Sequence, residues 1–289
     1  PEGTNWTDVA DLNFGSQAMR KEMISAMKYW VLEANVDGFR CDYADGVPAD
    51  FWKQAIDTLR GIPDRKLVMF AEGGEKELFS AGFDLIFGWN FYGKLKDLYE
   101  GKASVATLFN AHTADYSSVG QGKHILRWIT NHDDNAWDNT PTTIFGGVEG
   151  SVSAFVITAY MGGVPLIYNG QEVACPLKLQ FFSNANTKID WSLNPDVRLI
   201  YGKLLAIRNS SEALRGGELE NHSSDDVVAF TRTLDPDQVL VVVNVRNASR
   251  TFSIPAQLQS EWKDAVTDEI VPLDEQIQLE PYAYRIFRK

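Results

Sequence analysis

The sequence has very little cysteine. Only Cys41 and Cys175 occur among 289 residues. Two isolated cysteines form neither a disulfide framework nor a metal motif built from paired cysteines. We therefore interpret both as small buried residues, and the cellular compartment stays open.

The sequence also lacks an excess of positive charge. It contains 27 Lys and Arg against 39 Asp and Glu, which gives a formal net charge of −12. Binding to nucleic acid needs clustered Lys and Arg, so nucleic acid is not an expected partner. An anionic membrane surface is excluded for the same reason. A neutral substrate rich in hydroxyl groups remains compatible with this charge.

Long uninterrupted hydrophobic runs are missing as well. The longest apolar stretch, SVSAFVITAYMGGVPLIY at 151–168, is broken by GGVP in its middle. A membrane-spanning helix needs about 20 continuous apolar residues. We therefore predict a buried helix, a turn and a buried strand here. The first residues, PEGTNWTDVADLN, have neither a basic start nor an apolar run, which predicts no signal peptide.

No internal repeat or low-complexity tract is present. Charged residues make up 23% of the chain and hydrophobic residues 44%, as in ordinary globular proteins. The length is sufficient for one large domain, or for a large domain followed by a small one.

Helical and strand patterns alternate through the first three quarters of the chain. The strand segments are continuously apolar, which is typical of a parallel sheet covered by helices. The predicted helices are 14–36, 48–62, 90–112 with a break near Gly101, 149–163 and 194–214. The predicted strands are 36–42, 66–74, 83–89, 124–134 and 164–172.

The pattern changes near residue 217. The segment 226–255 alternates apolar and polar residues with a turn at LDPDQ, and YAYRIFRK at the end of the chain is one more strand. This alternation predicts a small antiparallel β domain. We therefore expect two domains, 1–216 and 217–289.

Polar residues follow the ends of several predicted parallel strands. Asp42 ends the first, Glu72 the second, His132 and Asp133 the fourth, and Gln171 with Glu172 the fifth. A single carboxylate at a strand end is usually a helix cap or a salt bridge. Several in one chain are typical of a parallel α/β barrel, where this face carries the chemistry.

The residue types suit retaining hydrolysis of glycosides. That reaction needs a carboxylate nucleophile and a carboxylic acid about 5 to 5.5 Å apart. Arg40 lies two residues before Asp42, so both can point the same way and the guanidinium can keep Asp42 ionised. A plain salt bridge is the alternative. Glu72 follows the apolar LVMFA, a dry setting that favours a protonated acid. Asp133, with His132, is placed to stabilise positive charge on the sugar.

Several short blocks resemble the α-amylase family of glycoside hydrolases. VDGFRCD, FAEGG and ITNHDDN resemble three of its signature blocks, and VADLNF the block before them. GGVPLIYNGQE resembles the last barrel strand of the family, and LLAIRNSSEALRGGELE its last barrel helix. The order of the blocks is that of the family. The resemblance implies the C-terminal portion of a (β/α)8 barrel, with about five strands, followed by a small antiparallel β-sandwich.

The resemblance implies roles residue by residue. Asp42 is the implied nucleophile, Glu72 the acid/base and Asp133 the stabiliser of the transition state. Arg40 and His132 are the implied contacts to the distorted sugar. A plain core role for His132 remains the alternative. No cofactor and no metal are expected, and the expected partner is an α-linked glucan.

Two departures from the family pattern stand out. Many amylases carry Lys-His after the nucleophile, which touches the sugar and supports a calcium ion, whereas this chain has Asp45 and Gly46. The first strands of the barrel are also missing, together with the loop domain that supplies calcium ligands. We therefore expect a fragment that binds no structural calcium, is inactive alone, and associates with itself or with a missing N-terminal part.

Three functions remain in competition. The first is an α-glucan hydrolase or transglycosylase, acting on starch or malto-oligosaccharides. The second is a non-enzymatic scaffold that binds carbohydrate or protein, and the third is an unrelated barrel enzyme. Three retained carboxylates favour the first. Trp89, Phe91, Tyr92 and Trp137 could stack on sugar rings or pack internally, and the linkage of the substrate stays open.

Overall fold

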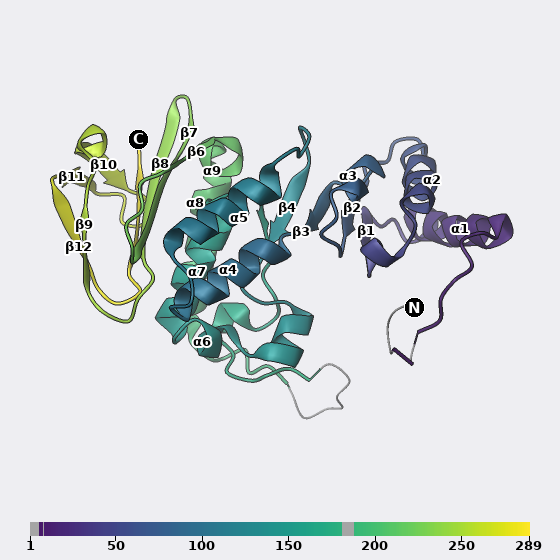
Figure 1. Cartoon of the computed structure of the whole chain (residues 1–289), viewed down its shortest axis with the longest axis horizontal. Helices are drawn as coiled ribbons and strands as arrows, with labels where there is room; N and C mark the ends of the chain where they lie inside the picture. Colours follow the sequence, from purple (N-terminus) through teal and green to yellow (C-terminus); the bar gives the residue numbers. More distant parts are fainter. Residues whose placement is uncertain (1–5, 8, 181–187) are drawn as a thin grey trace. The chain divides into compact units, whose positions relative to one another are not determined.

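The computed structural model describes residues 6–7, 9–180 and 188–289. The chain divides into two compact units. The first comprises residues 1–89 and 116–126, and the second comprises residues 90–115 and 127–289. Each unit is described by itself below, with the element labels of Figure 1.

The first unit is built on parallel strands. These are β1 (Gly38–Cys41), β2 (Val68–Ala71), β3 (Leu85–Phe87) and β4 (His124–Arg127), whose last residue belongs to the second unit. Each strand pairs with the next one along the chain, in parallel. The helices are α1 (Gln17–Glu33), α2 (Ala49–Arg60) and the single turn α3 (Glu77–Ser80).

Apolar side chains from these helices and strands form the core of the first unit. Helix α2 has apolar residues at helical spacing and buries Phe51, Ile56 and Leu59 among others. Met69 of β2 is fully buried in the same cluster. Burial of this apolar area is what holds helix and sheet together. Cys41 is free and buried here, as predicted, and burial raises the pKa of its thiol to about 12.

The second unit begins with helices. They are α4 (Trp89–Tyr99, its first residue in the first unit), α5 (Val105–Tyr116, its last residue in the first unit), α6 (Pro141–Ile144), α7 (Val148–Tyr160), α8 (Pro195–Ser210) and α9 (Glu212–Gly216). The predicted break near Gly101 is confirmed, since α4 ends at Tyr99. The predicted single helix 194–214 is wrong at its end, because the Ser211 side chain accepts the Leu214 N–H and starts a new helix.

The stretch 151–168 folds into helix, turn and strand as predicted, but the strand has only two residues and is half-buried, so the prediction of a buried strand is wrong. Helix α7 is buried on all sides from Gly150 to Tyr160, and Gly162 and Gly163 follow with positive φ. Strand β5 (Val164–Pro165) comes next, and Leu166 donates its backbone N–H to the carbonyl of Arg127 at 2.7 Å. The parallel strands therefore have the order β1-β2-β3-β4-β5.

The five parallel strands β1 to β5 are all shorter than the sequence predicts, and β4 and β5 differ most. Strand β4 ends at Arg127 and β5 at Pro165, whereas the apolar pattern extended them to Asp134 and Glu172. The backbone beyond β4 turns instead into one turn of π-helix, Asp134–Asp138. Residues 128–131 beyond β4 are buried and residues 166–168 beyond β5 are half-buried without extending either strand, so apolar character alone overestimates the strand length.

The C-terminal part of the second unit is antiparallel. Its main sheet has the order β11-β10-β13-β8-β7-β6, and β12 pairs with β9 in a second sheet. The strands are β6 (Glu218–Asn221), β7 (Val227–Leu234), β8 (Asp237–Asn244), β9 (Arg250–Ser253), β10 (Ser260–Asp264), β11 (Ile270–Leu273), β12 (Gln276–Leu279) and β13 (Tyr284–Arg288).

The central hairpin of this domain is covered on both faces. Val227, Ala229 and Leu240 pack with Phe252 of β9 and Leu279 of β12 in one apolar cluster. Figure 1 shows β7 and β8 between the β9–β12 sheet and helices α8 and α9. Strand β7 is accordingly buried from Val227 to Arg232 on both faces, not on alternate residues alone.

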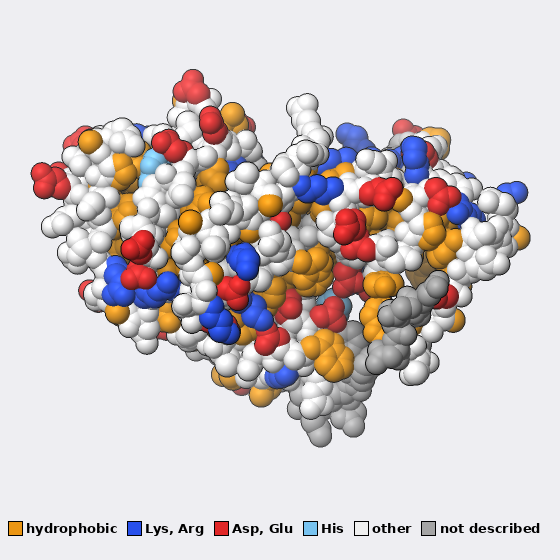
Figure 2. All heavy atoms as spheres, viewed as in Figure 1, with side chains coloured by type: hydrophobic (Ala, Val, Ile, Leu, Met, Phe, Trp, Pro, Cys, Tyr) orange, Lys and Arg blue, Asp and Glu red, His pale blue; other side chains and the backbone are white. Residues whose placement is uncertain are grey.

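The fold class inferred from the sequence is confirmed. Consecutive parallel strands with intervening helices, as in part of a (β/α)8 barrel, precede an antiparallel β domain. In the part of the chain that the structure describes, no helix combines the length and apolarity that a membrane crossing requires. On the face drawn in Figure 2, acidic side chains are scattered among basic ones.

Candidate active site

The first group of predicted site residues lies at the ends of β1 and β2. In the parallel register, Cys41 pairs with Ala71, so Asp42 and Glu72 follow the two strands at the same edge of the sheet. The Glu72 N–H donates to the Cys41 carbonyl at 2.8 Å, which continues the ladder by one bond. The two carboxylates are therefore neighbours because of strand register.

Arg40 joins these two carboxylates. Its guanidinium forms one ion pair with Asp42 and a second with Oε1 of Glu72 at 2.6 Å. The predicted pairing of Arg40 with Asp42 is thus present, whereas sequence reasoning missed the pairing with Glu72. The Asp42 side chain is 78% exposed and that of Glu72 only 16%. The same cation thus contacts one open and one sheltered carboxylate.

The setting of Glu72 favours its protonated form. Burial is the largest influence and raises its pKa, and the negative charge of Asp42 raises it further. The Tyr43 N–H, which donates to Oε2 at 3.0 Å, and the Arg40 guanidinium act in the opposite direction. The net result is a pKa above the usual range of a glutamate, which is the direction a general acid requires.

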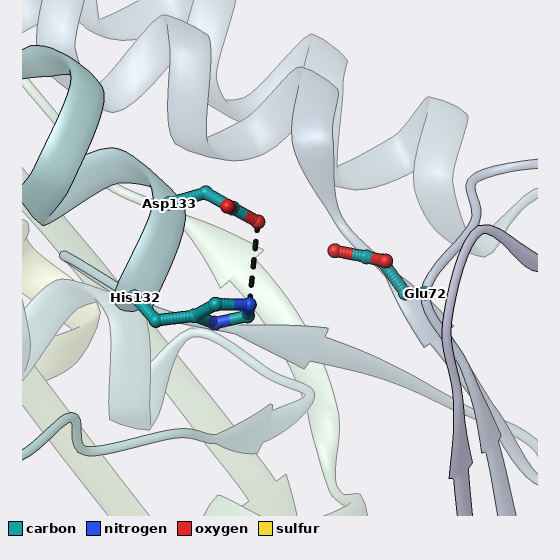
Figure 3. A group of neighbouring side chains, drawn as sticks. All are labelled: Glu72, His132 and Asp133. Atoms are coloured by element: carbon teal, nitrogen blue, oxygen red, sulfur yellow. Dashed lines mark ion pairs between the residues drawn. The ribbon is translucent and has the colours of Figure 1, made fainter. Parts of the chain in front are cut away.

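The second group, His132 and Asp133, follows β4 in the second unit. Nε2 of His132 lies 3.5 Å from Oδ2 of Asp133, and Figure 3 marks this pair with a dashed line. Their side chains are 40% and 32% exposed. Figure 3 also draws Glu72 at the end of its own strand in the first unit.

The turn that carries Asp133 is anchored from beneath by buried groups. The indole N–H of Trp128, a fully buried side chain, donates to Oδ2 of Asp134 at 2.7 Å. The Asp134 N–H donates in turn to Oδ1 of Asn131 at 2.8 Å. Burial raises the pKa of Asp134 against the influence of Trp128 and Lys96. Sequence reasoning missed this anchor, because only the fold brings Trp128 under the turn.

Of the other residues singled out in the sequence, some are buried in the core and some are exposed. Gln171 is buried and donates its amide N–H to the Tyr201 hydroxyl at 3.1 Å. Phe91 and Tyr92 are core residues, 1% and 6% exposed, so their packing alternative holds. Trp89 and Trp137 are 38% and 67% exposed, each in its own unit.

Imidazole and carboxylate side chains also bind metals. His132 and Asp133 offer two such ligands in the second unit, fewer than the three or four protein ligands of a typical zinc site. Among the described residues, neither unit by itself gathers three of them. In the first unit, both oxygens of Asp45 accept backbone N–H groups, from Gly74 and Glu75. We assign no metal to these residues.

Comparison with known proteins finds similarity in both parts of the chain. Residues 218–286 match the family described as Maltogenic Amylase, C-terminal domain. Alpha-amylase MalA of Haloarcula japonica is 26% identical over 265 residues, which cover 87% of this chain and 37% of that protein. Alpha-amylase 3 of Dictyoglomus thermophilum is 24% identical, over 89% of this chain and 59% of the relative.

Solved structures agree with these relatives. The maltogenic alpha-amylase AmyB from Thermotoga neapolitana superposes with a TM-score of 0.84 at 25% identity, covering 98% of this chain and 68% of that one. An alpha-amylase from Lactobacillus plantarum gives 0.85 at 20% identity, covering 100% and 71%. The chain thus spans between about a third and three fifths of the two sequence relatives named above.

Proposed function

We propose that this chain, which is similar over most of its length to the C-terminal region of α-amylase-family proteins, carries the catalytic residues of a retaining α-glucan hydrolase. Its relatives are named as α-amylases, cyclomaltodextrinases and maltogenic amylases, which supports hydrolysis of α-glucans. The finer assignment of substrate and of catalytic residues is our proposal.

In this proposal, Asp42 is the nucleophile and Glu72 the acid/base. Glu72 first donates its proton to the glycosidic oxygen while Asp42 attacks the anomeric carbon and forms a glycosyl ester. Glu72 then removes a proton from water, which attacks the anomeric carbon and releases Asp42. Asp133 stabilises the positive charge of the transition state, and Arg40 and His132 contact the sugar. Trp137 is an exposed aromatic surface for stacking on a sugar ring.

One observation carries this assignment. Arg40 bridges an open carboxylate and a sheltered one at the ends of adjacent parallel strands, and the pKa of the sheltered one is raised. An ionised nucleophile beside a protonated acid is what the two-step reaction needs. A purely structural salt bridge would not need a second carboxylate of raised pKa.

The test combines turnover with trapping of the nucleophile. Maltoheptaose and pullulan are incubated with the complete barrel, that is, this chain together with an N-terminal barrel part, and a 5-fluoro-α-glucosyl fluoride is used to accumulate the glycosyl ester. We expect shorter malto-oligosaccharides with retained configuration and a label on the peptide that contains Asp42. A label on another residue would refute the assignment. Binding of glucan without turnover would favour the non-enzymatic scaffold, and longer products would favour transglycosylation.

We further propose a domain division at 216/217 and an incomplete catalytic unit. Helix α1 exposes Tyr29, Trp30 and Leu32 at 58%, 53% and 52%, and β1 pairs with β2 alone among the described strands. An exposed edge and an exposed apolar helix face favour association. We expect the isolated 289 residues to self-associate in light scattering, or to bind an N-terminal barrel part, with little activity alone. A monomer with ordinary amylase turnover would contradict this.

A further inference from the structure

Backbone N–H groups of the segment after β1 form hydrogen bonds with Glu72, which follows β2. The Tyr43 N–H donates to Oε2 of Glu72 at 3.0 Å, and the Ala44 N–H donates to the Glu72 carbonyl at 2.9 Å. Both backbone and side chain of Glu72 are therefore held by the residues that follow Asp42. The position of Glu72 depends on how firmly these two segments stay together.

Asp45 holds the residues that follow Glu72 in the loop 73–75. It lies in the turn Ala44–Gly46, and its Oδ2 accepts the N–H of Gly74 at 2.8 Å. Its Oδ1 accepts the N–H of Glu75 at 3.2 Å. Two successive backbone donors after Glu72 thus end on a single carboxylate. Hydrogen bonds to a charged acceptor are stronger than neutral ones.

The loop is shaped to receive this carboxylate. A Cβ atom on Gly73 would lie 2.5 Å from Oδ1 of Asp45, and Gly73 is buried. No other residue type leaves room for the Asp45 side chain at this distance. The glycine at position 73 is therefore explained by the close approach of Asp45.

We propose that Asp45 is a positioning residue for Glu72, which holds the loop 73–75 and thereby sets where the acid/base carboxylate lies. This inference rests on the proposed function for the role of Glu72, and on the contacts of Asp45 for the rest. Asp45 contacts only backbone groups in this arrangement, so it acts through the loop and is not itself a catalytic residue.

The charge at this position also explains a departure noted in the sequence. An ammonium group has hydrogen-bond donors only, so a lysine at position 45 cannot accept the N–H groups of Gly74 and Glu75. In many amylases the lysine at this position contacts the sugar, whereas Asp45 of this chain accepts hydrogen bonds from backbone N–H groups. In this chain the position belongs to the support of the acid/base loop.

The first experiment measures the loop directly in the 289-residue chain. Amide hydrogen exchange of Tyr43, Gly74 and Glu75 is compared between the wild type, Asp45→Ala and Asp45→Lys. Asp57→Asn is the matched control, since Asp57 is an exposed carboxylate of the same unit paired with Lys53. We expect exchange of all three amides to become roughly 10-fold faster or more in both Asp45 variants, as for the loss of a bond of about 1.4 kcal/mol, and to stay unchanged in the control.

The second experiment separates positioning of the acid from general damage. Hydrolysis of maltoheptaose requires protonation of the leaving group, whereas α-maltosyl fluoride has a leaving group that needs none. In the complete barrel, a misplaced acid should lower kcat on maltoheptaose by on the order of 10². The kcat/KM on the fluoride reports only the formation of the glycosyl ester, so it should change by less than about threefold, since the acid contributes little to that step. The KM for maltoheptaose should stay nearly constant. Gly73→Ala, which displaces Asp45 from the other side, should give the same selective loss.

The outcomes decide between the two proposals separately. Unchanged amide exchange in Asp45→Ala, or equal loss on both substrates, would overturn the positioning role. If the complete barrel with the wild-type Asp45 cleaves neither substrate, the proposed function fails. Exchange of the Tyr43 amide, whose acceptor is Glu72 itself, still tests the role of Asp45 in that case. Faster exchange in Asp45→Ala supports the positioning role, and unchanged exchange overturns it.

Discussion

The two groups of candidate site residues are held in different ways. In the first unit, Asp42 and Glu72 share one guanidinium and are tied to each other's segments by backbone hydrogen bonds. In the second unit, Asp133 immediately precedes a π-helical turn, whose first residue Asp134 accepts a hydrogen bond from the buried Trp128. The first group is organised by charge and strand register, and the second by packing.

Because the two groups are held differently, substitutions in them should affect different properties, catalysis in the first group and stability in the second. Substitutions among exposed charges at the ends of strands alter the chemistry more than the stability, because little buried area depends on them. Substitution of a carboxylate that satisfies a buried indole alters the stability, because the indole N–H is left without an acceptor.

Asp42→Asn should have the largest effect, on chemistry alone. In the complete barrel, loss of the nucleophile should reduce kcat for glucan hydrolysis by at least ~10³-fold, because the covalent route disappears. The urea midpoint should hardly move, since Asp42 is 78% exposed. Steady-state assays and urea unfolding of the same preparation measure both. Retained turnover in a preparation free of other amylases would place the nucleophile elsewhere.

Asp134→Ala should destabilise the second unit. The Trp128 indole N–H would be buried without its acceptor, a loss of about 1–3 kcal/mol in the free energy of unfolding. Asp134→Asn should lose less, because an amide oxygen can still accept. Urea unfolding followed by tryptophan fluorescence measures the difference. Equal stability of the alanine variant and the wild type would show that the anchor is not needed.

Gly46→Ala should have a smaller effect in the first unit. A Cβ atom at position 46 would lie 2.0 Å from Cε1 of Tyr43, so the partly exposed ring must move. We expect a loss of about 1 kcal/mol in the free energy of unfolding. In a double-mutant cycle, Tyr43→Ala should remove most of that loss. Purely additive losses would mean that the ring and the glycine are independent.

The smallest effect concerns pH and stability. The pKa of Glu72 is raised above its ordinary 4.5 in the folded state, so the folded chain binds this proton more tightly than the unfolded chain. Its contribution is fully present below the ordinary value and is lost as the pH rises through the folded value. Relative to Glu72→Gln, the wild type should lose less than about 1 kcal/mol between pH 4 and 7.

Urea unfolding at these two pH values measures the loss, with Glu77→Gln, an exposed glutamate of α3, as the control. A wild type that gains stability relative to Glu72→Gln over the same range would contradict the direction of the shift.

Much of the fold could be predicted from local patterns. The order of helices and strands, the break near Gly101, the end of α7 at the glycine pair and the antiparallel tail all follow from periodicity and from glycine positions. The ends of β4 at Arg127 and of β5 at Pro165 could not be predicted, since the segments that follow them are as apolar as strands. The π-helical turn Asp134–Asp138 likewise depends on what packs beneath it.

From the sequence alone one can infer that the strands are parallel, that Asp42 and Glu72 lie at strand ends, and which residue types make up the candidate site. Periodicity and strand-end position are local properties, so no distant contact is needed to state them. Three contacts are visible only in the tertiary structure. Arg40 pairs with Glu72 as well as with Asp42. Asp45 accepts the N–H groups of Gly74 and Glu75, and Trp128 donates its indole N–H to Asp134. These contacts join segments through register and packing, and sequence spacing does not encode them.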